Sequence, residues 1–127
     1  MGLELIPAYG HHEEIVTLFT EYTDMLMEQD AVVRQYLILQ NYQKELAHPE
    51  SKYGMPEGRL FLAGWDGQLA GCIGLRKLDK DRGELKRLYV RSDFRGHQIG
   101  EQLIRRILDD AREIGYRHVL LDTLPFL

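Results

Sequence analysis

Residues 88–100 read LYVRSDFRGHQIG, and this stretch decides how the rest of the chain is interpreted. It predicts the end of a β-strand at Val90, a tight basic turn that contains Gly96, and a helix that begins at Ile99. A strand that leads directly into a helix leaves the first backbone N–H groups of the helix free, at the positive end of its dipole. The stretch therefore predicts an anion-binding site.

Composition narrows the class of protein. The chain has 127 residues, which suits a single domain. Its net charge of -4 gives no overall attraction for nucleic acid, so the anion site must act locally and we expect no nucleic-acid partner. No apolar run reaches membrane-spanning length and no signal-peptide pattern opens the chain, so we expect a cytoplasmic protein without membrane attachment.

Cysteine and histidine usage argues against a metal site. The single cysteine, Cys72, excludes an internal disulfide and a cysteine-rich zinc site, and its apolar neighbours predict a buried thiol. His11 and His12 have no carboxylate or cysteine partners at ligand spacing. We therefore expect no metal.

The first part of the chain predicts a strand and two helices. A short strand covers Leu3–Ala8, where Pro7 favours a sheet edge. Apolar residues recur at three- and four-residue steps over His12–Glu28, which predicts an amphipathic helix, and a second helix is expected over Val32–Ala47. The loop Glu50–Gly58 has no periodic pattern, and we expect it to be functional or mobile.

The middle of the chain predicts an antiparallel meander of three strands. Arg59–Trp65 and Gln68–Leu75 are apolar runs joined by Asp66–Gly67, a dipeptide typical of a two-residue hairpin turn. After a polar turn, Glu84–Val90 forms the third strand. The meander leads directly into the turn of residues 88–100.

The third strand breaks its own alternation. Leu85 and Leu88 are three residues apart, with Lys86 and Arg87 between them, so strict alternation would place the leucines on opposite faces. A bulge near Lys86–Arg87 would bring both leucines inward and bend the strand. The alternative is a strand buried on both faces with charged residues near its ends. We favour the bulge.

The last part predicts a β-α-β unit. Ile99–Ile114 has the clearest helical periodicity in the chain, and Arg117–Thr123 reads as the following strand. A strand, a helix and a second strand imply a parallel, right-handed crossover. The expected fold class is α/β (α+β), with a mixed central β-sheet flanked by helices.

The apolar stretch Leu124–Leu127 follows that strand directly. We expect from this that residues 1–127 form one domain whose C-terminal part is missing. The Val119–Thr123 strand would then have an uncovered edge and exposed apolar surface. A homodimer or poor solubility is the expected consequence.

The residues of the turn resemble the acetyl-CoA-binding motif of the GNAT N-acetyltransferases. The family pattern is Gln/Arg-x-x-Gly-x-Gly/Ala at the start of the central helix; Arg95 and Gly100 match its ends, while Gln98 replaces its middle glycine. Gln98 still supplies a backbone N–H, so the departure costs backbone freedom rather than a donor. The resemblance implies a GNAT-like acyl-CoA N-acyltransferase fold and places the cosubstrate at Leu88, Tyr89, Val90, Arg95, Gly96, His97, Gln98, Ile99, Gly100 and Glu101.

The resemblance also implies a division of roles. Backbone groups of Leu88 and Val90 would bind the pantetheine arm and the thioester, in a gap between this strand and its parallel neighbour. Glu84 is the candidate general base that takes the proton of the amine; the alternative is a solvated residue paired with Lys86 or Arg82. Tyr89 is expected to be a packing aromatic rather than a general acid.

The leading hypothesis is an acetyl-CoA-dependent N-acetyltransferase that acts on a primary amine of a small molecule or peptide. The first two helices and the Glu50–Gly58 loop would contact this acceptor, with Tyr22, Tyr36 and Tyr53 as wall residues. Acids at Glu45, Glu50 and Glu57 would suit a cationic amine. The alternatives are a CoA-binding module or sensor without catalysis, and a structural interaction domain that binds no CoA.

Overall fold

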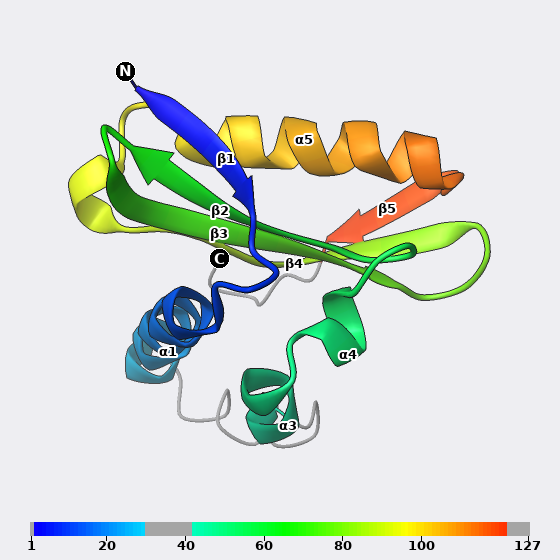
Figure 1. Cartoon of the computed structure of the whole chain (residues 1–127), viewed down its shortest axis with the longest axis horizontal. Helices are drawn as coiled ribbons and strands as arrows, with labels where there is room; N and C mark the ends of the chain where they lie inside the picture. The colour runs from blue at the N-terminus through cyan, green and yellow to red at the C-terminus, as the bar shows by residue number, and fades with distance from the viewer. Residues whose placement is uncertain (1, 30–41, 122–127) are drawn as a thin grey trace.

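The computed structural model describes residues 2–29 and 42–121, which form a five-stranded sheet with helices on both faces (Figure 1). The strands lie in the order β1-β2-β3-β4-β5. β1 to β4 are antiparallel neighbours, whereas β5 runs parallel to β4, so the predicted mixed sheet is confirmed. The strands are β1 (Leu3–Pro7), β2 (Arg59–Trp65), β3 (Gln68–Lys77), β4 (Arg82–Val90) and β5 (His118–Leu121).

Helix α5 (Ile99–Ile114) covers one face of the sheet, and α1 (His12–Gln29), α3 (Tyr42–Ala47) and α4 (Glu50–Tyr53) cover the other (Figure 1). The predictions for α1 and α5 are confirmed, because the apolar periodicity of each segment reports directly on its buried face. The predicted second helix is confirmed over α3; its earlier part lies outside the described residues.

The prediction of an unstructured loop at Glu50–Gly58 is wrong in its first half. These residues include α4, which places Tyr53 in the core with 0% of its surface exposed. The ring meets Phe19 edge-on at 6.2 Å, and it lies against Gly74, where an added Cβ would come within 2.9 Å of the ring. A four-residue helix is too short to show periodicity, so its buried aromatic gave no signal in the sequence.

Strand β2 is buried on both faces, which explains its continuous run of apolar residues. Leu60 and Leu62 join the core beneath α1, whereas Phe61 and Ala63 join the core beneath α5. Alternation along the strand sends successive side chains to opposite faces. The two cores fix the sheet from both sides and so fix the strand ends that form the site.

The hairpin-turn prediction is confirmed, and so is the prediction that Pro7 lies at a sheet edge, because β1 is the first strand in the order. Asp66 and Gly67 have φ values of 51° and 82°, as a type I′ hairpin turn requires. Leu120 and Leu121, on the edge strand β5, are 40% and 63% exposed. Dimerisation through this edge stays a prediction. In the described part of the chain, no helix combines the length and the apolar composition needed to cross a bilayer.

Candidate functional site

The predicted strand, turn and helix meet as expected. β4 ends at Val90, a single 3-10 turn η1 (Ser92–Phe94) follows, and α5 begins at Ile99. Gly96 has φ +92°, a left-handed conformation in which a side chain would be strained. Gly96 therefore provides the turn geometry that aims the helix start at the strand end.

The first amides of α5 face the turn. Gln98 is the residue before the helix, and its carbonyl accepts the first helical hydrogen bond from the N–H of Gln102 at 3.1 Å. The N–H groups of Ile99, Gly100 and Glu101 have no carbonyl one turn earlier within the helix. The Gln98 side chain makes no capping hydrogen bond. These amides are therefore the candidate donors of the anion site that the sequence predicts.

Gly100 keeps this end of the helix open. A Cβ added to it would meet only Cγ2 of Val90, at an ordinary 3.8 Å. No packing requirement therefore excludes a side chain here, and the absence of one leaves room beside the amides. The same proximity shows that the last residue of β4 lies next to the first turn of α5.

The other predicted residues of the turn differ in their environments. Arg95 is exposed, and its Nε donates to the carbonyl of Val90 at 3.4 Å. His97 stacks on Trp65 of β2 with ring centroids 4.3 Å apart. Ile99 is 2% exposed, so only its backbone can serve a ligand. Glu101 is exposed and accepts a hydrogen bond from Arg105 at 3.0 Å.

Leu88, Tyr89 and Val90 divide between the two faces of the sheet. Leu88 and Val90 pack against the core beneath α5, and Tyr89 packs against the core beneath α1, where its ring meets Tyr22. The Tyr89 hydroxyl donates to Glu21 at 3.2 Å. Burial, followed by the charge of Glu21, raises the pKa of Tyr89. These contacts support the packing role predicted for Tyr89.

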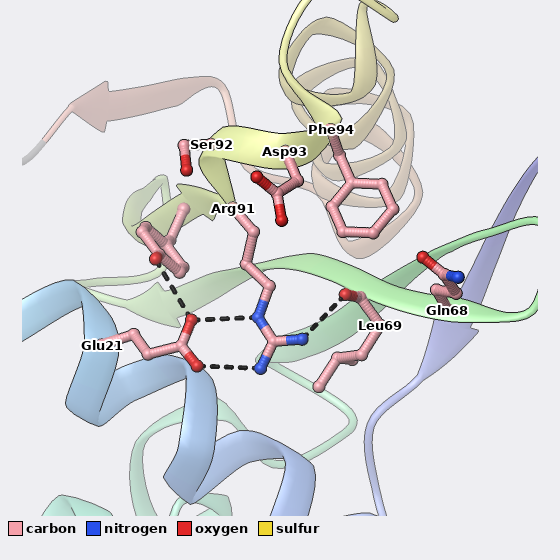
Figure 2. A pocket seen from close by; sticks show the side chains of 8 residues that line it. Glu21, Gln68, Leu69, Arg91, Ser92, Asp93 and Phe94 are labelled. Carbon is pink, nitrogen blue, oxygen red and sulfur yellow. Dashed lines mark hydrogen bonds and ion pairs between the residues drawn. The ribbon is translucent and has the colours of Figure 1, made fainter.

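A pocket of about 600 Å³ opens beside this strand end, and sequence reasoning missed it. Figure 2 shows Glu21 of α1 facing Arg91, whose guanidinium also reaches Leu69 of β3. Arg91 donates to both carboxylate oxygens of Glu21, at 3.0 and 2.8 Å. The pair is separated by 70 residues in sequence, so no local pattern revealed it. The lining is Glu21, Gln68, Leu69, Tyr89, Arg91, Ser92, Asp93 and Phe94.

The predicted bulge in β4 is confirmed. Lys86 pairs with Gly74 and Tyr89 pairs with Cys72, so β4 has one more residue than β3 between the two pairs. Arg87 has φ +59° at this point. Leu85 and Leu88 both reach the core beneath α5, as the bulge prediction required.

The charges at the bulge were not predicted. Lys86 and Arg87 are each 3% exposed, and Arg87 donates to both carboxylate oxygens of Glu45 on α3, at 2.7 and 3.0 Å. Lys52 donates to the same carboxylate at 2.8 Å. The assignment of Glu45 to a solvated acidic surface for a cationic acceptor is therefore wrong, because its side chain is 0% exposed and paired.

The structure shows the ion-pair partner of the candidate base, Glu84. Glu84 pairs with Arg76 on the neighbouring strand β3 at 3.3 Å, rather than with Lys86 or Arg82.

The prediction of Tyr53 as a wall residue is wrong because it is fully buried, and Tyr22 is 7% exposed. Tyr36 lies outside the described residues. Cys72 is buried as predicted, and burial raises the pKa of its thiol, which disfavours a nucleophilic role.

We predict that Gln98→Gly stabilises the protein. Gln98 has φ 61°, and a left-handed backbone costs a non-glycine residue about 1–2 kcal/mol. Glycine also gives the unfolded chain more conformational freedom, which lowers the free energy of unfolding by about 0.4–1 kcal/mol. The expected net gain is about 0.5 kcal/mol in the free energy of unfolding, measured by urea denaturation. Gln102→Gly, inside the same helix, is the control and should lose about 1 kcal/mol; equal losses in both variants would contradict the strain argument.

A family model described as the acetyltransferase (GNAT) family matches residues 15–126. An N-acetyltransferase from Dictyostelium discoideum is 27% identical, in an alignment that covers 100% of this chain and 84% of that protein. One from Schizosaccharomyces pombe is 38% identical, over 72% of this chain and 57% of that protein. An acetyltransferase crystal structure from Streptococcus agalactiae has the same fold, with a TM-score of 0.76 at 22% identity over 98% of this chain and 75% of that one.

Proposed function

The chain belongs to the GNAT family of acetyltransferases, and from this premise we propose that it transfers the acetyl group of acetyl-CoA directly to a primary amine of a small molecule or peptide. One observation carries the proposal: the end of β4 lies beside the free amides at the start of α5. A pyrophosphate on those amides, near Arg95, would direct the rest of the cosubstrate along β4.

The path along β4 is supported by the pairing of its neighbours. β4 pairs with β5 from Arg82 to Leu85, and the described part of β5 ends at Leu121. Near the end of β4, the N–H of Arg91 donates to the carbonyl of Ala70 on β3, so alternation along β4 turns the backbone groups of Val90 away from β3. We place the backbone groups of Leu88 on the same side as those of Val90. These groups are the proposed partners of the pantetheine arm and of the thioester carbonyl.

The proposed reaction is a direct displacement. The amine nitrogen attacks the thioester carbon, the carbonyl oxygen becomes an oxyanion, and the C–S bond then breaks to release the CoA thiolate, which takes up a proton. A backbone N–H of β4 aimed at the oxygen would stabilise the oxyanion, and donors of this kind contribute about 3–4 kcal/mol to transition-state stabilisation. The amine must lose its protons along the way, which requires a base.

Glu84 remains our candidate for that base. It lies four residues before Leu88, about 13 Å along an extended strand, so it would act through intervening water. Its side chain is 19% exposed, which leaves the carboxylate within reach of solvent. Arg76, its partner, is also accessible at 33%.

We predict that Glu84→Gln lowers kcat by about 100-fold and removes the ionisation of the base from the pH–rate profile. Arg76→Gln is the matched control, because it breaks the same ion pair and leaves the carboxylate in place. The Arg76→Gln enzyme should still show the ionisation of the base in its pH–rate profile. A Glu84→Gln enzyme with the wild-type profile would remove Glu84 from the mechanism.

The activity itself is tested by release of the CoA thiol from acetyl-CoA in the presence of amines. Polyamines, amino acids, amino sugars and peptides with free N-termini make up the panel, and calorimetry measures binding of acetyl-CoA separately. We expect saturable binding and thiol release that depends on one class of amine. Saturable binding with no release across the panel would instead indicate a CoA-binding module, and absence of binding would overturn the proposal.

A further inference from the structure

The ion pair between Glu45 and Arg87 is buried at the bulge of β4. The two side chains are 0% and 2% exposed, and the guanidinium also lies 5.5 Å from the centre of the Tyr42 ring. Removing two charges from water costs several kcal/mol per ion, and apolar residues of similar volume often stabilise a fold as well or better. Stability alone is therefore a weak explanation for a charged pair at this place.

The backbone of Arg87 has an unfavourable conformation that other contacts must stabilise. Its φ of +59° is uncommon for a residue with a long side chain, and the left-handed conformation costs about 1–2 kcal/mol. Contacts among the described residues help to hold this conformation. The guanidinium is bound at two points by Glu45, and the Arg87 carbonyl accepts a hydrogen bond from the Cys72 thiol at 3.4 Å.

Because of its position in β4, the conformation of Arg87 controls the orientation of the peptide group that follows it. Leu88 follows Arg87 directly in the strand. The dihedral angles of Arg87 therefore set the direction of the next peptide group, which carries the N–H of Leu88. This N–H belongs to the backbone proposed to contact the thioester.

We infer that Glu45 is a positioning residue for acetyl transfer. Through Arg87 it holds the bulge in the conformation that aims the β4 backbone at the thioester oxygen. Lys52, in the short helix α4, donates to Oε1 of the same carboxylate and so adds a second cation that holds Glu45 in place. The inference rests on the proposed function, because it concerns the donor site of that reaction.

The test compares two ligands that differ only at the acetyl group. Dissociation constants of CoA and acetyl-CoA are measured by calorimetry for wild type, Glu45→Gln and Arg87→Lys. Gln preserves shape but loses the charge, and Lys preserves the charge but loses the two-point contact. We expect both variants to bind acetyl-CoA about tenfold more weakly while the affinity for CoA changes less than threefold. Once an acceptor is known, kcat should fall at least tenfold with little change in the KM for that amine.

Asp110→Asn is the matched control for general loss of a buried carboxylate. Asp110 pairs with Arg59 at 3.1 Å and is 11% exposed, but it lies on α5, away from the bulge. It should lower the melting temperature without changing the ratio of CoA to acetyl-CoA affinity. An unchanged ratio in Glu45→Gln and Arg87→Lys, or the same change in Asp110→Asn, would overturn the inference. Wild type that binds neither ligand would instead overturn the proposed function.

Discussion

Replacing Arg87 by methionine should lower the free energy of unfolding by about 3 kcal/mol, because it leaves the carboxylate of Glu45 buried without its main partner. Lys52 remains in contact with that carboxylate, which places the loss at the lower end of the usual range. The melting temperature should fall by roughly 10 °C for a domain of this size. Chemical and thermal denaturation measure both quantities.

A double variant separates the charge effect from the loss of packing. E45L/R87M removes both charges of the pair and should recover most of the stability that Arg87→Met loses, because no carboxylate is left buried without its guanidinium and the Lys52 side chain, at 18% exposed, can turn its ammonium toward solvent. A double variant as unstable as the single one would show that the guanidinium acts mainly through its contacts with Tyr42 and the rest of the core.

The effect of Arg87→Met should also depend on pH. Burial by itself raises the pKa of Glu45, but the hydrogen bonds and charges of Arg87 and Lys52 outweigh it and hold the pKa below its ordinary value. In wild type, this carboxylate therefore stabilises the fold above its unfolded pKa, and that stability is lost as pH falls through the folded value. Without Arg87, burial dominates and the folded pKa rises, so acidification should narrow the stability gap between variant and wild type. A gap that widens on acidification would contradict this account.

Replacing Gly71 by alanine should impair the site itself. A Cβ at this position would lie 2.4 Å from the carbonyl oxygen of Tyr89 and 3.3 Å from Cα of Val90, both in the backbone of β4. Neither atom belongs to a flexible side chain, so the strand must move. We expect acetyl-CoA binding at least tenfold weaker, and a loss of about 1–3 kcal/mol in stability.

Gly64→Ala provides the matched control for this variant. Gly64 lies in β2, where the nearest atom to an added Cβ is 3.7 Å away, an ordinary contact. It should retain wild-type affinity for acetyl-CoA in calorimetry. Wild-type affinity in Gly71→Ala would show that the position of β4 at Tyr89 and Val90 does not matter for the donor.

Features encoded by neighbouring residues were predictable from the sequence. The buried residues Ile99, Leu103 and Ile107 recur at four-residue steps, so α5 could be placed with its buried face correctly assigned. The bulge could be inferred because Leu85 and Leu88 violate a strict period of two, and only an extra residue lets both reach one core. The strand-to-helix turn followed from Gly96 and the helix that begins after it.

Features that depend on distant partners were not predictable. Glu45 and Arg87 are 42 residues apart, and a glutamate on a short helix is normally solvated, so nothing local distinguished it from Glu50 or Glu57. The pairing of Glu84 with Arg76 likewise depends on the register between two strands, which the turn between them sets. The candidate donor site could therefore be predicted from the sequence, whereas the buried charged groups beside it could not.

The stacking of His97 on Trp65 gives the protein an optical signal of its own. Trp65 is the only tryptophan in the chain, and its ring lies 4.3 Å from an imidazole that belongs to the turn. Indole emission is sensitive to an adjacent imidazole, and most strongly to a protonated one. Tryptophan fluorescence therefore reports on the surroundings of Trp65, which include this turn, so that ligand titrations can be recorded on the unlabelled protein.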